Sequence, residues 1–299
     1  MVRLSRRARG ESRGGIARSP LRERRRRVVN ALMLTLTGVA TVVTIIPLLL
    51  IFFYLLEAGF GSLNLDFFTE VPAPVGQAGG GVGNAILGTL ELVLFAGLLG
   101  LPVALGAGVF LAEAGEGRLA TAVRFVADVM NGIPSIVVGI FVWAWLVVSM
   151  GHFSLFAGSV ALAVMLVPMV TRTTEEMIRL VPRELREGGL ALGLTRWRTT
   201  IGIVLPAAKS GILTGILVAL ARVAGETAPL LFTAFGNPFW SWRPDQPVAA
   251  LPLQIFQYAI APYEDWHRQA WAGALVLIGL VLIVNLSARY LIRSPYREQ

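Results

Sequence analysis

The chain has 299 residues, of which 55% are hydrophobic and 15% are charged, and its mean hydropathy is +0.69. This composition is too apolar for a soluble domain and predicts a membrane protein. The net charge of +8 does not indicate nucleic-acid binding, because the basic residues gather near the N-terminus and in short segments beside apolar runs. Cysteine is absent, which excludes a disulfide or a thiolate metal site.

The N-terminal segment, residues 1–27, contains eleven arginines and no apolar run. We interpret it as a cytoplasmic tail that faces solvent and lipid headgroups. We expect no signal peptide, because the apolar segment that follows, 28–56, is too long for a signal sequence.

Six apolar segments are long enough to cross a bilayer, which predicts an all-α membrane protein. The predicted spans are 28–56, 82–111, 121–150, 155–177, 207–233 and 269–290. Residues 57–81 form an outer loop, 82–292 the main transmembrane domain, and 293–299 a C-terminal tail. With the N-terminus inside, the two long outer loops hold only two basic residues, Arg243 and Arg268. Both termini are therefore predicted to be cytoplasmic.

The second span carries a small residue at every fourth position. These residues are Ala96, Gly100, Ala104, Gly108 and Ala112. They share one helix face, and small residues let helices approach closely in lipid. We predict that this face packs against another span.

The third span contains Asn131-Gly-Ile-Pro134-Ser135. Pro134 removes a backbone hydrogen bond, which predicts either a simple kink or a broken helix whose free N–H groups face an anion. Arg124 and Asp128, one helical turn apart, are predicted to form a structural ion pair. In the next span, Arg172 lies near the inner end, where it either lines a pathway or extends to the lipid headgroups.

A polar segment, 182–206, separates the fourth and fifth spans. Pro182 is typical of a first helical turn and Gly193 of a left-handed C-cap, so 182–192 is predicted to be a short helix with Glu187 near its middle. Thr195 is expected to cap a second helix that runs to Pro206.

Within the first of these helices, Gly188 and Gly189 each cost about 1 kcal/mol of helix propensity relative to alanine. We therefore expect this helix to depend on a partner for its stability.

In the fifth span, Arg222 and Glu226 lie four residues apart and are predicted to share one helix face near the middle of the bilayer. An arginine at that depth costs at least roughly 2.5–3.5 kcal/mol on insertion scales, and a neighbouring carboxylate offsets that cost. The pair either fixes the rotation of the helix or forms an anion site, because guanidinium binds phosphate-like oxyanions through two hydrogen bonds.

The outer loop 234–268 is rich in aromatic residues: Phe239, Trp240, Trp242, Tyr258, Tyr263 and Trp266. Its apolar stretch 248–260 is too short to span and predicts a re-entrant or interfacial helix. The aromatic residues form either an interfacial belt or a docking surface for an extracytoplasmic binding protein.

The chain lacks the motifs of an ATPase or a metalloenzyme. A Walker A loop requires lysine after glycine, whereas the only lysine, Lys209, follows Ala208. His152 and His267 are far apart in sequence and have no pattern of metal ligands nearby. We therefore expect that the chain is not an enzyme in its own right.

Five further segments resemble the PstA permeases of high-affinity phosphate importers: Gly83-Asn-Ala-Ile-Leu-Gly-Thr-Leu90, Asn131–Val137, Thr171–Met177, Ala221–Ala234 and Ala250–Phe256. The polar segment is similar to the E-A-A-x3-G-x9-I-x-L-P coupling loop of ABC importer permeases. It matches this loop at Glu187, Gly193, Ile203, Leu205 and Pro206, and it differs by having Gly188 and Gly189 in place of two alanines.

The resemblance implies a type I ABC importer permease fold with six transmembrane helices and a cytoplasmic coupling helix, in a bacterial inner membrane. It implies a shared central pathway for the substrate, to which we assign Arg222, Glu226, Thr227, Asn131, Ser135 and Arg172. It implies contact with an ATPase through Glu187, Gly188, Gly189, Gly193, Leu205 and Pro206.

The partners implied by the resemblance are a second, PstC-like permease, two PstB-like ATPase subunits and an extracytoplasmic PstS-like phosphate-binding protein, together with membrane lipid. ATP and Mg would be used by the ATPase, and this chain would bind no cofactor. Two alternatives stay open: a permease for another oxyanion, such as sulfate or molybdate, and a free-standing channel or secondary transporter.

Overall fold

The structure, a computed structural model, describes residues 20–75, 77 and 79–291. The predicted C-terminal tail and residues 1–19 of the predicted N-terminal tail lie outside the described residues. Within them, five helices are long and apolar enough to cross a membrane, and a bent pair of helices supplies a sixth candidate span. The predicted all-α architecture is confirmed.

The chain divides into two compact units, 1–54 and 55–299. The first contains most of α1 (Pro20–Phe60), which includes the predicted first span. Residues 22–54 of this helix have exposed side chains, whereas Leu55 in its last part is buried. The hydroxyls of Thr37, Thr41 and Thr44 each donate to the carbonyl four residues earlier, which satisfies them in apolar surroundings.

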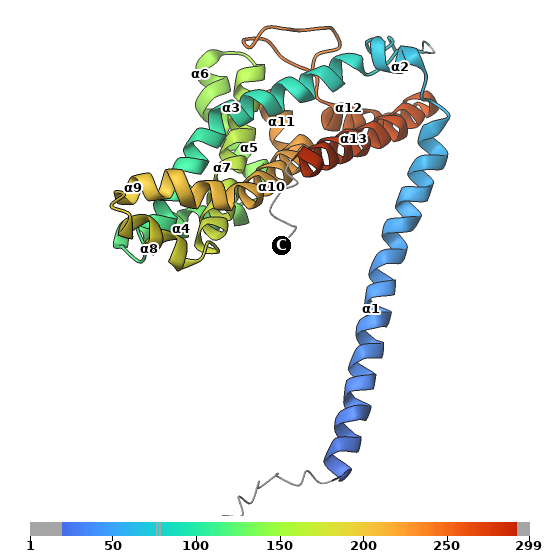
Figure 1. The fold of residues 1–299 in the computed structure, drawn as a ribbon. Coiled ribbons are helices and arrows are strands. Elements are labelled where there is room, and N and C mark those ends of the chain that lie inside the picture. The colour runs from blue at the N-terminus through green and yellow to red at the C-terminus, as the bar shows by residue number, and fades with distance from the viewer. Residues whose placement is uncertain (1–19, 76, 78, 292–299) are drawn as a thin grey trace, which may run out of the picture. The chain divides into compact units, whose positions relative to one another are not determined.

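The second unit holds the other helices (Figure 1). In chain order they are α2 (Leu65–Thr69), α3 (Gly83–Glu113), α4 (Arg118–Gly132), α5 (Ser135–Val142), the π-helical turn η1 (Trp143–Val147), α6 (Val148–Met150), α7 (Leu155–Arg179), α8 (Arg183–Ala191), α9 (Arg196–Thr199), the π-helical turn η2 (Thr200–Val204), α10 (Leu205–Ala224), α11 (Ala228–Thr233), α12 (Leu251–Ala259) and α13 (Glu264–Leu291).

The small-residue face of α3 packs against α7, as predicted. Ala96 and Ala104 are fully buried, and a Cβ added to Gly108 would lie 2.5 Å from the Cβ of Thr174. The hydroxyl of Thr171 donates to the Ala104 carbonyl across this interface. Glycine and alanine therefore bring the two backbones close enough for a hydrogen bond between helices.

Helix α10 packs on another face of α7 in the same way. A Cβ on Gly211 would lie 2.4 Å from Sδ of Met177, and one on Gly215 would lie 2.2 Å from Cγ2 of Thr173. The two contacts fix the register between these helices. The core lies where α3, α7 and α10 meet.

The predicted third span is a broken helix and not a simple kink. Helix α4 ends at Gly132, α5 begins at Ser135, and the chain bends by 103° between them. Pro134 cannot donate the hydrogen bond that would continue α4, and it also disfavours the helical conformation at Ile133.

The prediction of one continuous helix over 207–233 is wrong. Helix α10 ends at Ala224, and α11 begins at Ala228 after three non-helical residues. Pro229 has no N–H to donate to the carbonyl of Gly225, and glycine itself has low helix propensity. The two residues are one turn apart, so both weaken the helix at the same place.

The expected end of a separate helix at Pro206 is also wrong. Residues 196–224 form one helical run, in which η2 leads directly into α10. The N–H of Leu205 donates to the carbonyl of Thr200, five residues back. Pro206 therefore lies inside this run, directly after the π-helical turn, where it removes one backbone donor from the helix.

The predicted short helix in the outer loop is confirmed as α12. It is packed inside the protein, with Leu251 and Leu253 almost fully buried. Its first N–H, on Leu251, donates to the hydroxyl of Thr89 in α3 at 2.7 Å. Because α12 neighbours α13 and α3, the outer loop belongs to the folded body of this unit.

Candidate translocation and coupling sites

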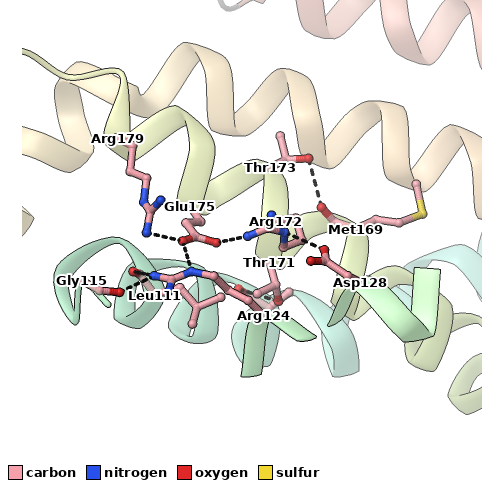
Figure 2. A network of polar contacts seen from close by, with 11 residues as sticks. Leu111, Gly115, Arg124, Asp128, Met169, Thr171, Arg172, Thr173, Glu175 and Arg179 are labelled. Carbon is pink, nitrogen blue, oxygen red and sulfur yellow. Dashed lines mark hydrogen bonds and ion pairs between the residues drawn. The ribbon is translucent and has the colours of Figure 1, made fainter. Parts of the chain in front are cut away.

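A buried carboxylate, Glu175 of α7, gathers three arginines (Figure 2). Its side chain is 1% exposed, and its Oε1 accepts Nε of Arg124 at 2.6 Å and Nη2 of Arg179 at 2.8 Å. Its Oε2 accepts Nη1 of Arg172 at 2.5 Å. Every oxygen of this buried charge is thus engaged by a charged donor, which is the condition for keeping an ion away from water.

Arg124 lies on α4, so its contact with Glu175 joins α4 to α7. A second ion pair joins the same two helices. Nε of Arg172 lies 2.9 Å from Oδ1 of Asp128 on α4. Arg124 and Asp128 are one turn apart on α4, and both bind α7 instead of each other. The predicted Arg124–Asp128 pair is therefore wrong. The face that carries both residues is turned toward α7, where each finds an opposite charge.

Arg172 does not join Arg222, although both were predicted to line the pathway. Gly211 faces Met177 and Gly215 faces Thr173, so this antiparallel register brings Arg222 level with Leu166. Arg172 lies six residues further along α7, about 9 Å along the helix axis at 1.5 Å per residue. The structure places Arg172 in the Glu175 cluster.

Arg222 and Glu226 do not share a helix face. Arg222 lies in the last turn of α10, and Glu226 lies in the break that follows. Among the described residues, neither side chain forms an ion pair. A cation in the last turn of a helix interacts favourably with the helix dipole, so Arg222 is partly stabilised without a carboxylate. Its side chain is exposed and free to meet a ligand or another subunit.

The helix break between α4 and α5 and the break between α10 and α11 lie near one close contact, which joins α5 to α11. A Cβ on Gly139 of α5 would lie 2.6 Å from Cα of Pro229 in α11. Ser135 begins α5, and Asn131 lies in the last turn of α4, on the other side of the first break. Thr227 lies in the second break, and its hydroxyl donates to the Pro252 carbonyl at 3.5 Å. The structure thus brings the predicted residues Asn131, Ser135 and Thr227 to neighbouring interruptions of two spans.

The predicted coupling helix is α8, which starts just after Pro182. It ends in a Schellman motif: the N–H of Leu194 donates to the Gly189 carbonyl, and the N–H of Gly193 donates to the Leu190 carbonyl. Gly193 has φ +81°, the left-handed conformation predicted for it. Thr195 stands at the N-cap of α9, although its side chain makes no capping hydrogen bond.

The two glycines of α8 have different environments. A Cβ on Gly189 would lie 2.8 Å from both Ile203 Cδ1 and Thr199 Cγ2, whereas one on Gly188 would meet nothing within 4 Å. Gly189 is therefore needed for packing against the following helical run. Gly188 and Glu187 belong to the exposed side of α8. Leu205 and Pro206 lie at the start of α10, directly after the η2 turn that contains Ile203.

This difference predicts opposite effects of alanine at the two positions. Gly188→Ala should slow hydrogen exchange in α8, because alanine adds about 1 kcal/mol of helix propensity without a clash. Gly189→Ala should speed it, because overpacking costs about 1–3 kcal/mol and outweighs the gain of about 1 kcal/mol in helix propensity. Hydrogen exchange of the α8 amides measures both effects. Equal exchange in the two variants would contradict the packing seen between α8 and η2.

The outer aromatic residues fall into two groups. Trp266 stacks on Tyr258 with 4.7 Å between ring centroids, and Tyr263 packs edge-on against Trp266. Phe239, Trp240 and Trp242 are exposed. In the same loop, the hydrogen bond from Arg243 lowers the pKa of the Asp245 carboxyl, and that of Arg243 is raised in turn. Both interpretations, aromatic belt and docking surface, stay open.

Glu175 was not predicted as a site residue, although its spacing from two arginines is a signal in the sequence. Glu175 lies three residues after Arg172 and four before Arg179, the spacings that place charges on one helix face. Its third partner, Arg124, is fifty-one residues away in sequence. That contact depends on the packing of α4 against α7 and has no local signature.

Known proteins that resemble this chain in sequence show the family to which it belongs. The model of the family described as binding-protein-dependent transport system inner membrane component matches residues 104–295, so the chain belongs to that family and is a multi-pass inner-membrane protein. Two proteins named phosphate transport system permease protein PstA, from Xylella fastidiosa (strain Temecula1 / ATCC 700964) and Yersinia pestis, are each 46% identical to it. These matches cover 90% and 88% of this chain and 94% and 90% of the relatives. Within the family, the chain belongs to the PstA permeases.

Solved structures show the same fold. A chain of the MetNI methionine ABC transporter, described as inward facing, has TM-score 0.55 and 20% identity over 70% of this chain and 95% of that one. A chain of a bacterial alginate ABC transporter has TM-score 0.62 and 15% identity over 92% of this chain and 98% of that one. At these identities the likeness establishes the type I ABC permease fold alone, as predicted.

Proposed function

We propose that this chain is the transmembrane permease subunit of an ATP-driven phosphate importer. It forms half of the translocation pathway and couples to a separate ATPase through residues 182–206. The observation that carries the proposal is the 46% identity, over about nine tenths of the chain, to proteins named phosphate transport system permeases. The exposed and capped helix α8 supports the coupling role.

The remaining half of the pathway would come from a second, PstC-like permease. ABC permeases act with an ATPase and a substrate-binding protein, so we assign α8 to a dimer of PstB-like ATPases and the exposed outer aromatic residues to a PstS-like phosphate-binding protein. ATP and Mg belong to the ATPase, and this chain binds no cofactor. Both termini are cytoplasmic, because the arginine-rich segments then face the cytoplasm.

The anion pathway lies at the two helix breaks. Arg222 supplies a positive charge beside the second break, and guanidinium holds a tetrahedral oxyanion through paired hydrogen bonds. Ser135 supplies a hydroxyl, and the backbone N–H groups at the start of α5 supply further donors. Glu226 and Thr227 line the second break, where a carboxylate favours an anion that still carries a proton over one that carries none.

A transport assay tests the substrate. Cells that express the complete transporter and lack other phosphate uptake systems should accumulate radiolabelled phosphate only when the ATPase is active. A tenfold excess of sulfate or molybdate should leave that uptake unchanged. Strong competition by sulfate or molybdate would favour the other-oxyanion alternative, and uptake without the ATPase would favour the channel or secondary transporter.

Coupling through α8 gives a prediction for two substitutions. Glu187→Ala removes an exposed charge at the centre of α8, and Gly193→Pro is incompatible with the observed φ of +81°. Both should weaken co-purification of the ATPase or reduce the phosphate taken up per ATP hydrolysed. Gly193→Asn should perform better than Gly193→Val, because asparagine accepts the left-handed conformation. Normal ATPase binding and normal uptake in both Glu187→Ala and Gly193→Pro would overturn the coupling role of α8.

A further inference from the structure

Helix α8 is tied to the ends of two spans by one side chain. Nη1 of Arg186 lies 2.5 Å from Oε1 of Glu113, the last residue of α3. Nη2 of Arg186 donates to the carbonyl of Ile178 in the last turn of α7 at 3.1 Å. The Ile178 carbonyl also accepts the N–H of Val181, so Arg186 adds a second donor at this helix end while it pairs with Glu113.

A second arginine contacts the turn that follows Glu113 and joins α3 to α4. Nη2 of Arg124, on α4, donates to the carbonyls of Leu111 and Gly115, each at 2.7 Å, and Nε of the same group binds Glu175. Figure 2 shows these three contacts around one guanidinium. The turn that joins α3 to α4 is therefore clamped between Arg186 of α8 and Arg124 of α4.

These contacts connect α8 to the first helix break. Beyond Arg124, Asp128 binds Arg172 of α7, only four residues before α4 ends at Gly132. Past the bend, α5 is packed on α11 through Gly139 and Pro229. A displacement of α8 thus has a continuous route of ion pairs and close packing to the break at Ile133 and Pro134.

We propose that Glu113 and Arg186 are positioning residues of energy coupling, which carry the movement of α8 into α4 and so to the helix break. This inference rests on the proposed coupling of α8 to an ATPase. The pair suits transmission better than stabilisation, because the side chain of Glu113 is 34% exposed and that of Arg186 is 24% exposed. Partly exposed ion pairs contribute little to stability. A role in folding alone would therefore leave transport by the folded protein unchanged.

The test is a charge reversal in the complete transporter. Glu113→Arg and Arg186→Glu each put like charges side by side, and the double variant restores an ion pair of opposite polarity. We expect each single variant to take up about fivefold less phosphate per ATP hydrolysed, the low end of the range for coupling between two sites. The double variant should recover most of this ratio. Glu116→Arg is the matched control, because Glu116 is an exposed carboxylate in the same turn.

The measurements are the membrane abundance of the chain, co-purification of the ATPase, ATP hydrolysis and phosphate uptake. The inference is overturned if either single reversal keeps the wild-type ratio, or if the double variant does no better than the single ones. If a reversal lowers abundance, Glu113→Gln decides, because it removes the charge without adding repulsion. A wild-type ratio in Glu113→Gln then overturns the inference.

If the proposed function is wrong, measurements on the wild-type transporter will reveal it. A wild-type complex that takes up another oxyanion overturns the phosphate assignment, and the ratio is then measured with that oxyanion. A wild-type chain that binds no ATPase overturns the proposed function and this inference together. If only the charge-reversed variants lose coupling, the inference is supported, whether the wild-type complex transports phosphate or another oxyanion.

Discussion

Arg222→Ala should reduce phosphate uptake about 10- to 100-fold while leaving the chain in the membrane, since hydrogen bonds to charged groups contribute roughly 1.5–3 kcal/mol. The reason is the position of this guanidinium. It lies in the last turn of α10, exposed, and among the described residues no carboxylate pairs with it. The arginine is therefore available to an anion at the neighbouring helix break.

The expected dependence on geometry separates an anion site from a structural charge. Arg222→Lys keeps the charge and loses the planar fork, so it should retain part of the uptake. Arg243→Ala is the control, because Arg243 is an exposed arginine of the outer loop that is paired with Asp245. Uptake of radiolabelled phosphate, corrected for membrane abundance, is the measurement. Wild-type uptake by the Arg222→Ala variant would reduce Arg222 to a charge at a helix end.

Glu175→Ala should destabilise the chain by about 3–5 kcal/mol, the loss that follows when one member of a buried charge cluster is removed. The substitution leaves three arginines around the space of a carboxylate that is 1% exposed. Their mutual repulsion should loosen α4 from α7. Glu175→Gln keeps the shape and loses the charge, so it should be nearly as harmful.

The adjacent residue provides the matched control. Glu176 is exposed on the same turn of α7, so Glu176→Ala should have little effect on stability. Thermal unfolding of the purified chain in detergent compares the variants. If Glu175→Ala and Glu176→Ala unfold at the same temperature, the arginine cluster does not hold α4 to α7.

Local rules predicted the features that depend on neighbours in sequence. The six apolar segments follow from the length needed to cross a bilayer, and the left-handed Gly193 follows from its place after a short amphipathic helix. The small residues of α3 predicted a close helix contact, because a four-residue period places them on one face. Each feature is set by residues close in sequence, and the structure agrees with the number of candidate spans, the conformation of Gly193 and the close contact of α3.

The predictions that failed concerned how far a helix continues and which charges meet. The apolar composition of 207–233 allowed one helix, but Gly225 and Pro229 interrupt it, so Arg222 and Glu226 no longer share a face. Hydropathy reports the preference for lipid and not the backbone hydrogen bonds, and so it could not reveal this break.

For this protein, the sequence by itself determined the membrane class, the short polar helix α8 with its left-handed cap, and the family to which the chain belongs. Only the tertiary structure decided that Arg124 and Asp128 bind α7 and not each other, and that Arg186 ties α8 to Glu113. Ion pairs between helices depend on register and rotation, which arise from the packing of whole helices. The physical reason is that a charge selects its partner by distance, and distances between residues remote in sequence exist only in the folded chain.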